Sequence, residues 1–196
     1  MENWVAETLR SNGLSDKAKL VAASDESIKE IAHQPIYDEQ AFKRSLRHKS
    51  KLTQLLNTHL LLSQIVSVFL MQNLENATAL KFERWGLEKK VDLLLALGAC
   101  PPMITEVIKQ INSLRNKVAH EFGYKIDPVD LRRIHEKFPR EFWKELDEEV
   151  SFSKTMFVVT YMFEEDRREN AERLLNKQKA FARLRIALDG FQQQTS

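Results

Sequence analysis

The sequence predicts an all-α protein, a helical bundle with extra helices at its N- and C-terminal ends. Only five glycines and five prolines interrupt its 196 residues, which are otherwise rich in good helix formers. Apolar residues recur at helical spacing in most segments. By periodicity alone, residues 156–163 could form a strand, but no second strand is available to pair with them. We therefore interpret this run as a buried helix.

The composition is that of a soluble globular protein, with 43% hydrophobic and 30% charged residues. The formal net charge is only +2, so no global basic field indicates nucleic-acid binding. The single cysteine, Cys100, excludes an intrachain disulfide and a cysteine-based metal cluster, and we expect it to be a loop or packing residue. We see no signal peptide, and the apolar stretch 60–71 is too short to span a bilayer. A cytoplasmic protein with no membrane partner is expected.

Three parts can be distinguished along the chain. Residues 1–35 predict an N-terminal helical arm of two or three short helices, broken at Gly13 and Pro35. Residues 36–140 predict the helical bundle, and residues 141–196 predict long C-terminal helices that pack on it. The charge pattern of residues 164–190 is typical of an exposed amphipathic helix.

The bundle begins with Asp38, a candidate N-cap for a helix from Glu39. A helix over 52–73 follows, and because it is apolar nearly all round after Leu60, it should lie centrally or at a subunit interface. His59, with no partner at helical spacing, is interpreted as a core-edge histidine. Between these helices lies a basic run that is either a solvated face or an RNA-facing patch. Its members are Lys43, Arg44, Arg47, His48, Lys49 and Lys51.

Two helices predicted over 80–97 and 101–123 should pack as an antiparallel hairpin, since only a short link joins them. Gly98 is a natural cap for the first. Pro101 and Pro102 open the second, and Gly123 closes it. Asp127 then predicts the N-cap of a helix that runs to about residue 138.

The helix over 101–123 carries Arg115, Asn116 and His120. This helix is the only place in the sequence where a plausible reactive group comes with a plausible partner. Arg115 lies roughly 40° round the helix from Ile111, at the edge of an apolar stripe, and His120 lies roughly 140° further, in line with Asn112 and Asn116. The two groups could meet at one phosphate in three ways: the arginine extends round the helix, the last turn distorts, or a second subunit supplies one group. We favour the second subunit.

Structural roles for these residues have to be considered too. An arginine beside an apolar stripe often pairs with a carboxylate, and a histidine near a helix C-terminus interacts favourably with the helix dipole. However, residues 108–144 hold nine basic and five acidic residues, an excess that would attract a phosphate backbone. The candidate RNA-binding residues in this stretch are Lys117, Lys125, Arg132 and Arg133.

Other chemistry is not indicated. The chain has no Gly-rich phosphate loop, no His-x-x-x-His pair and no Gly-x-Ser-x-Gly motif. No carboxylate is expected in an apolar stripe where burial would raise its pKa. His135 has no obvious partner. We therefore expect no bound metal and no cofactor.

The motif Arg115-Asn116-x-x-x-His120, at the end of a helix in an all-α bundle, resembles the signature of the HEPN superfamily. Residues 52–138 also resemble the mannitol operon repressor family, which is HEPN-like in organisation. The shared features are an apolar helix, the LLALG sequence at 94–98, the Leu-Arg-Asn-x-x-Ala-His sequence at 114–120, and a helix started by Asp127. This resemblance covers a little under half of the chain.

The HEPN resemblance implies a metal-independent endoribonuclease, active as a homodimer, in a toxin or phage-defence system. His120 would act as general base on the ribose 2′-hydroxyl or as general acid on the leaving oxygen. Arg115 would stabilise the charge on the phosphate, and Asn116 would orient the histidine or the substrate. The implied partners are RNA, a second copy of the chain, and an antitoxin or regulatory protein.

One position departs from the HEPN pattern. Toxins regulated by a nucleotidyltransferase antitoxin have a tyrosine two residues after the histidine, and here that residue is Phe122. Neutralisation by tyrosine modification is therefore not expected. The alternative function is a non-catalytic regulator that resembles the mannitol operon repressor family and acts through protein–protein contacts. A third interpretation places function on residues 1–35 and 141–196, with the bundle as scaffold.

Overall fold

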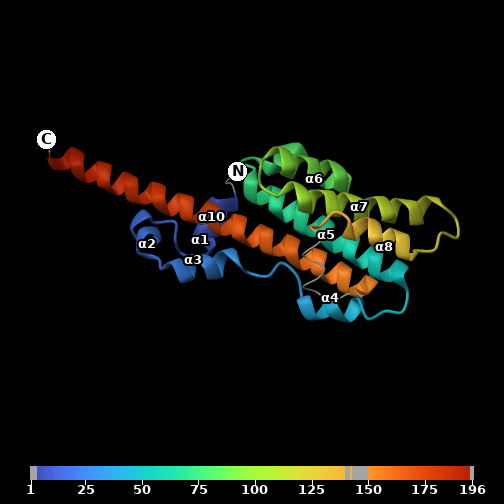
Figure 1. Ribbon diagram of the computed structural model, residues 1–196. Helices are drawn as coiled ribbons and strands as arrows, with labels where there is room; N and C mark the ends of the chain where they lie inside the picture. Colours follow the sequence, from blue (N-terminus) through green and yellow to red (C-terminus); the bar gives the residue numbers. More distant parts are fainter. Residues whose placement is uncertain (1–3, 140–141, 143–149, 195–196) are drawn as a thin grey trace.

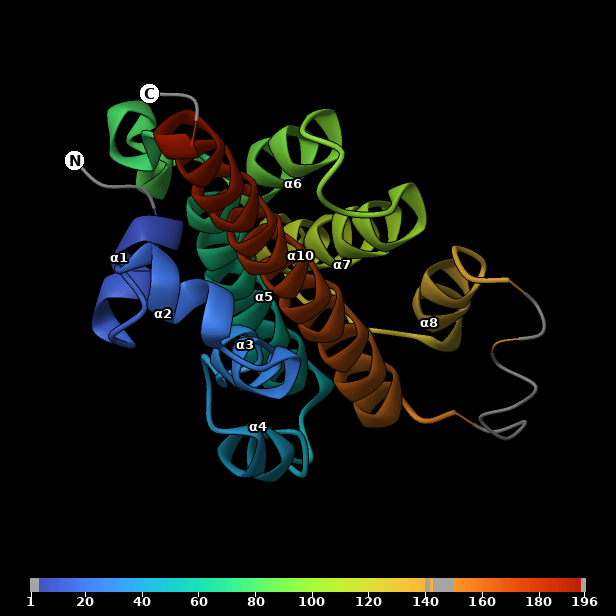
Figure 2. The same ribbon diagram turned by 90° about the vertical axis from the view of Figure 1, so that its left-hand side faces the viewer.

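The computed structural model describes residues 4–139, 142 and 150–194, and within these ranges every regular element is a helix. The predicted all-α class is confirmed. The long helix α10 runs along the molecule, with α1–α3 beside its C-terminal half and the bundle around its N-terminal half (Figure 1). A view at right angles shows α5 behind α10, with α6 and α7 together on one side (Figure 2).

The N-terminal segment forms three short helices, α1 (Trp4–Ser11), α2 (Lys17–Ala22) and α3 (Asp25–Ala32). Asp16 and Ser24 cap α2 and α3 through their side-chain oxygens. The buried apolar residues of the three helices form a single cluster with one face of α10, because α10 supplies the apolar surface that short helices lack. The cluster contains Val5, Leu9, Leu20, Ile28, Ala32, Ala171, Leu175 and Ala182.

The bundle consists of α4 (Glu39–Ser45), α5 (Lys51–Asn73), α6 (Leu87–Ala96), α7 (Pro102–His120) and α8 (Pro128–His135). The Asp38 side chain accepts the Ala41 N–H and caps α4, as its position predicts. Helix α5 packs against α6, α7 and α10, so it is the central helix of the core. By length and composition α5 could also cross a membrane, but many of its apolar residues line this core.

One predicted helix begins later than expected. Residues 80–86 do not belong to α6, since the chain first passes through two 3₁₀ turns, Ala77–Leu80 and Phe82–Arg84. Between them Lys81 adopts a left-handed conformation with φ of 45°. The turns bring Phe82 into the core, and Gly86 then caps α6 in an extended conformation.

Helices α6 and α7 form the predicted hairpin. Gly98, with φ of 63°, occupies the left-handed position after α6. The Ala99 N–H donates to the Leu94 carbonyl over 3.1 Å and the Gly98 N–H donates to the Leu95 carbonyl over 3.0 Å. These two bonds form a Schellman motif, which satisfies the last carbonyls of α6 and turns the chain into α7.

Helix α10 (Phe152–Gln194) is 43 residues long. Residues 156–163 lie within it and Met156, Val159 and Phe163 are buried, which confirms the interpretation as a helix. The expectation that 164–190 is an exposed amphipathic helix is wrong at Glu164 and Arg167, each 1% exposed. They pair with each other beneath the segment that joins α3 to α4. Parts of the predicted bundle and of the predicted C-terminal helices lie outside the described residues. These are Arg140 and most of residues 141–149, Lys144 included.

Candidate functional site

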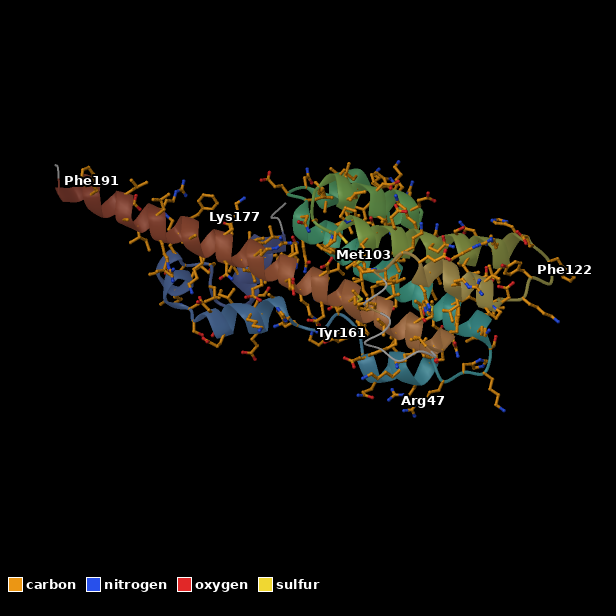
Figure 3. All side chains as sticks on the ribbon, viewed as in Figure 1. Arg47, Met103, Phe122, Tyr161, Lys177 and Phe191 are labelled. Atoms are coloured by element: carbon orange, nitrogen blue, oxygen red, sulfur yellow. The ribbon has the colours of Figure 1, made fainter. Side chains whose placement is uncertain are left out.

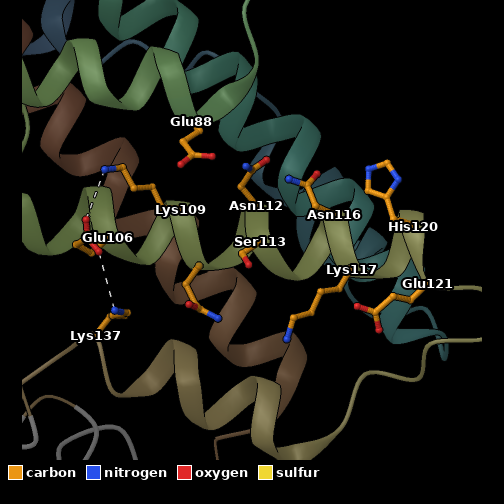
Figure 4. Close-up of a pocket in the computed structure, with 11 residues that line it drawn as sticks. Glu88, Glu106, Lys109, Asn112, Ser113, Asn116, Lys117, His120, Glu121 and Lys137 are labelled. Atoms are coloured by element: carbon orange, nitrogen blue, oxygen red, sulfur yellow. Dashed lines mark ion pairs between the residues drawn. The ribbon is translucent and has the colours of Figure 1, made fainter.

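An open groove of about 520 Å³ runs along α7 (Figure 4). Helix α7 supplies most of its lining, α6 adds Glu88, and the turn after α8 adds Lys137. The side chains of α7 and its C-cap in the groove are Glu106, Lys109, Gln110, Asn112, Ser113, Asn116, Lys117, His120 and Glu121. The groove therefore contains two of the three predicted catalytic residues and one of the four predicted RNA-binding residues.

A row of polar side chains leads along the groove to the end of α7. Asn112, Asn116 and His120 follow one another at four-residue spacing and point to the same side of the helix (Figure 4). Exposure increases along the row, from buried Asn112 to half-buried Asn116 to exposed His120. The imidazole thus stands where solvent, or a ligand in the groove, can reach it.

The end of α7 differs from the sequence prediction. His120 is the last helical residue and Glu121 is the C-cap, so the helix ends before Gly123. Gly123 has φ of 79° and lies in a turn closed by the bond from the Tyr124 N–H to the Glu121 carbonyl, 3.1 Å. The glycine is needed for this turn and not for the helix cap. His120 is consequently at the helix terminus itself.

Arg115 reaches toward the polar row from the other side of α7. Its side chain is half-buried, and Nη1 donates to Asn116 Oδ1 over 3.2 Å. Within the described ranges no carboxylate forms an ion pair with it. Of the three ways in which Arg115 and His120 could approach one phosphate, this contact corresponds to extension of the arginine round its own helix. A contribution from a second subunit stays a prediction.

His59 is a member of the site that the sequence did not indicate. It lies on α5, and its Nε2 and Asn112 Oδ1 are 3.0 Å apart. Burial lowers the pKa of His59, the bond to Asn112 opposes this, and the positive charge of Arg115 lowers it further. A neutral imidazole that donates from Nε2 fixes the Asn112 amide at the base of the row. The partners are 53 residues apart, which no helical spacing reveals.

Among the described residues, the charged side chains at one end of the groove form ion pairs, and those at the other end do not. Lys109 pairs with Asp92 at 2.7 Å and with Glu106 at 3.5 Å, and Lys137 lies 3.9 Å from Glu106. Lys117, in the last turn of α7, forms no ion pair with any residue that the structure describes, and its side chain points to the other side of the helix from His120 (Figure 4). The available positive charge is therefore at the His120 end.

The remaining predicted RNA-binding residues lie outside the groove. Lys125 is exposed in the segment between α7 and α8, and Arg132 and Arg133 are exposed on α8. Phe122, at 110% relative exposure, projects from the tip of the same segment (Figure 3). These four residues are therefore exposed, and none of them lines the groove.

A buried carboxylate anchors the segment between α7 and α8. The Tyr124 hydroxyl lies 2.7 and 2.8 Å from the two oxygens of Asp130, and this bond is the main reason that the pKa of Tyr124 rises to about 12. Asp130 also accepts the Asp127 N–H, which completes the capping box of α8. The tyrosine thus has a structural role that holds the end of the groove in place.

The expectation that no carboxylate would be placed where burial raises its pKa is wrong. Burial raises the pKa of Asp166 on α10, which accepts a hydrogen bond of 3.5 Å from Cys100 Sγ. Burial likewise raises the pKa of the Cys100 thiol, so this cysteine is a packing residue, as predicted. His135, expected to lack a partner, lies 2.8 Å from Thr155 Oγ1. Both contacts depend on α10, whose path the sequence does not specify.

Among residues 4–139, 142 and 150–194, no group of three or more His, Cys, Asp or Glu side chains could hold a metal ion. Comparison of the chain with models of protein families, with curated proteins and with solved structures finds no match in any of the three.

Proposed function

We propose that this protein is a metal-independent endoribonuclease of HEPN type that acts in the cytoplasm, in a toxin or phage-defence setting. The observation that carries the proposal is one hydrogen bond. Arg115, a cation without a carboxylate partner in the described structure, donates to Asn116, and Asn116 shares the groove wall with His120. The guanidinium is thereby bonded to an amide on the groove wall that also carries the imidazole, an arrangement that suits the binding of a phosphodiester.

The chemistry requires only these groups and the substrate. In the proposed step the ribose 2′-oxygen loses its proton to a base and attacks phosphorus, while the bond from phosphorus to the 5′-oxygen breaks and that oxygen gains a proton. The products are a 2′,3′-cyclic phosphate and a 5′-hydroxyl. His120 acts as the base or the acid, since an exposed imidazole can do either near neutral pH. Arg115 stabilises the negative charge on the phosphoryl oxygens.

Residues around the end of α7 are suited to hold a single strand of RNA. Lys117 lines the groove, and Lys125, Arg132 and Arg133 are exposed on the segment that follows α7 and on α8. Phe122 offers an exposed ring on which a base can stack. The need for a 2′-hydroxyl accounts for a preference for RNA over DNA.

A homodimer is part of the proposal because an apolar ridge adjoins the site. Leu52, Leu56 and Leu60 follow one another on the exposed face of α5, and Leu60 is 67% exposed. His59, from the same stretch of α5, bonds to Asn112 of the polar row, so ridge and row are neighbours. A twofold axis through the ridge would bring two polar rows together. An antitoxin or regulatory protein could silence the enzyme by covering the same surface.

The decisive experiment compares wild type with His120→Ala on total RNA in the presence of EDTA. We expect cleavage by wild type and a loss of roughly 10²–10⁴-fold in the variant. His33→Ala is the matched control, because it makes the same change in the arm, where His33 contacts Glu172. Cleavage that is equal in all three proteins, or that EDTA abolishes, contradicts the proposal.

The dimer has its own test. Leu56→Glu combined with Leu60→Glu should lower both the mass in solution and the cleavage rate, whereas Leu97→Glu, an exposed leucine at the end of α6, should change neither. An unchanged mass in the double variant would show that the ridge is not the dimer interface.

A second candidate function is a non-catalytic regulator that works through protein contacts. Three carboxylates, Glu88, Glu106 and Glu121, line the groove beside its lysines, and such mixed charge suits a protein surface as well as a nucleic acid. If purified protein leaves RNA intact under all conditions and the His120→Ala variant still forms the same complexes in cells, this candidate is preferred.

A further inference from the structure

A pocket of about 350 Å³ lies where the arm meets the bundle. Three parts of the chain line it: α1, the C-terminal end of α5 with the two residues that follow it, and the part of α10 that passes them (Figure 1). It shares no lining residue with the groove along α7. What binds in this pocket is therefore a separate question from RNA cleavage.

Gln72, in the last turn of α5, is a buried residue whose hydrogen-bonding capacity the fold leaves unused. It is 5% exposed, and its Oε1 has no hydrogen-bond partner among the residues that the structure describes. Buried polar atoms are nearly always bonded, because a buried oxygen loses the water to which it bonds in the unfolded chain. Gln72 lines the pocket, so a ligand there can supply the missing donor.

The next residue, Asn73, holds this end of α5 in place. Its Nδ2 donates to the Phe69 carbonyl over 2.8 Å, and its Oδ1 accepts from Asn170 of α10 over 3.2 Å. The fold thus satisfies both ends of the Asn73 amide and leaves Gln72 Oε1 open. Because α5 is bonded to α10 at this point, the open acceptor is held in position before a ligand arrives.

Two charges of opposite sign line the same pocket. Lys177 of α10 (Figure 3) and Glu75, two residues after α5, are both exposed, and in the described structure neither forms an ion pair. The Lys177 ammonium lies 5.9 Å from the centroid of the Phe181 ring, a contact that leaves its charge unneutralised. The pocket therefore offers a cation and an anion that a ligand with both charges can bridge.

Apolar side chains from all three parts complete the lining. Val5 comes from α1, Leu74 follows α5, and Leu174 and Phe181 come from α10. Sites for small molecules usually combine such a lining with a few polar groups that fix the orientation of the ligand. Their volumes are roughly 300–1,000 Å³, so this pocket suits a small ligand.

We propose that the pocket binds a free α-amino acid with an apolar or aromatic side chain. The ammonium group of the ligand donates to Gln72 Oε1 and is attracted by Glu75, and its carboxylate pairs with Lys177. The side chain of the ligand packs against the apolar lining.

Ligands that carry only one of the two charged groups match the lining less well. An apolar carboxylic acid leaves Gln72 Oε1 and Glu75 without a partner, and an apolar amine leaves Lys177 without one. A free amino acid satisfies all three with its own ammonium and carboxylate groups. The class of ligand thus follows from the polar atoms of the pocket and not from its volume alone.

A ligand in this pocket would contact the arm and the bundle at once. Helix α1 has only eight residues and is held by the packing of Val5 and Leu9. A molecule that binds only when α1 is in place stabilises the docked arrangement by mass action. The midpoint of thermal unfolding should therefore rise with the concentration of the amino acid.

Calorimetric titration and thermal unfolding of the full chain with L-leucine and L-phenylalanine test the class of ligand. The comparison compounds are 3-phenylpropionate, which lacks the ammonium group, and 2-phenylethylamine, which lacks the carboxylate. We expect saturable binding of at least one amino acid, and binding of each comparison compound that is weaker by roughly tenfold or more. Equal binding of a comparison compound, or no saturable binding of either amino acid at millimolar concentrations, overturns the proposal.

Three variants test the place of binding. Gln72→Met removes the buried acceptor at similar size and should weaken binding by roughly tenfold, while the thermal midpoint of the free protein stays the same or rises. Lys177→Met should weaken binding to a similar extent. Arg185→Met makes a matched change at an exposed position of α10 outside the pocket and should bind like wild type. Wild-type affinity in both Gln72→Met and Lys177→Met would show that the amino acid binds elsewhere, and the assignment to this pocket would fail.

Discussion

Arg167 on α10 and Arg115 on α7 are both withdrawn from full exposure, but only Arg167 is paired with a carboxylate. Arg167 donates from Nε and Nη2 to the two oxygens of Glu164 over 2.8 and 2.7 Å, and Nη2 also lies 3.3 Å from the Gln34 carbonyl. Arg168 adds a third bond to the same carboxylate, at 3.0 Å. Arg115, by contrast, donates to a neutral amide.

The difference separates a structural charge from an available one. Around Glu164 each charge has its counterpart within the fold, so the cluster holds α10 against the segment that joins α3 to α4 and has no remaining capacity for a ligand. Arg115 retains its full attraction for an anion, since an amide oxygen satisfies a hydrogen bond without neutralising the charge. For two arginines such as these, the hydrogen-bond partner therefore indicates availability to a ligand better than the degree of burial does.

The largest effect is expected from Arg167→Met. Removal of the guanidinium leaves Glu164 buried with only Arg168 near it, and the loss of one partner from a buried pair typically costs about 3–5 kcal/mol. The free energy of unfolding, measured by urea denaturation, should fall by this amount. Arg173→Met makes the same change at an exposed position of the same helix and should stay within about 0.5 kcal/mol of wild type. Similar losses in both variants would mean that the Glu164 cluster has no special role.

The same substitution at Arg115 should have the opposite profile. Arg115→Met removes one hydrogen bond to an amide, so the free energy of unfolding should change by about 1 kcal/mol or less. RNA cleavage should fall by roughly 10²–10³-fold, because charge stabilisation on the phosphate is lost. Arg115→Lys keeps a charge but loses the planar fork, and should recover only part of the activity. A variant that unfolds like Arg167→Met would identify Arg115 as structural.

Local signals in the sequence were sufficient for much of this architecture. Asp38 caps α4 through a residue three positions away, and the turn at Gly98 ends α6 through bonds that span three and five residues. The line of Asn112, Asn116 and His120 also follows from helix geometry alone. Each of these depends on residues within one or two turns, which the order of residues determines directly.

Contacts between distant segments could not be predicted in this way. His59 meets Asn112 across 53 residues, and Cys100 meets Asp166 across 66. Glu164 and Arg167 have the spacing of an ordinary exposed helix pair, and their burial depends on tertiary packing that includes the bond from Arg167 to the Gln34 carbonyl. The absence of a carboxylate partner for Arg115 in the described structure could not be predicted either, because it depends on which carboxylates the fold brings near.

Acid should weaken the fold through two partly buried histidines, His59 and His135. Burial lowers the pKa of both His59 and His135, so between these lowered values and the unfolded value of about 6.5 the unfolded chain binds more protons. Their contribution to stability is therefore present above pH 6.5 and is lost as the pH falls through the folded-state values. His59→Gln and His135→Gln should each flatten the dependence of unfolding free energy on pH between 5 and 7. Curves parallel to wild type would contradict this assignment.

The smallest expected effect concerns Asp166, which adjoins the paired Arg167 but is not itself matched by a cation of the cluster. Burial raises its pKa above the ordinary value of 3.8, so the folded chain binds more protons than the unfolded chain between the two values, and stability is lost as the pH rises through the folded-state pKa. The charged form of Asp166 thus lowers stability at neutral pH.

Asp166→Asn keeps an oxygen that can accept from Cys100, and should raise the midpoint of thermal unfolding at pH 7 by roughly 1–3 °C. The gain should vanish below about pH 4, where wild-type Asp166 is protonated in both states. A variant less stable than wild type at pH 7 would show that the Asp166 charge is compensated after all, by Arg173 on the same helix.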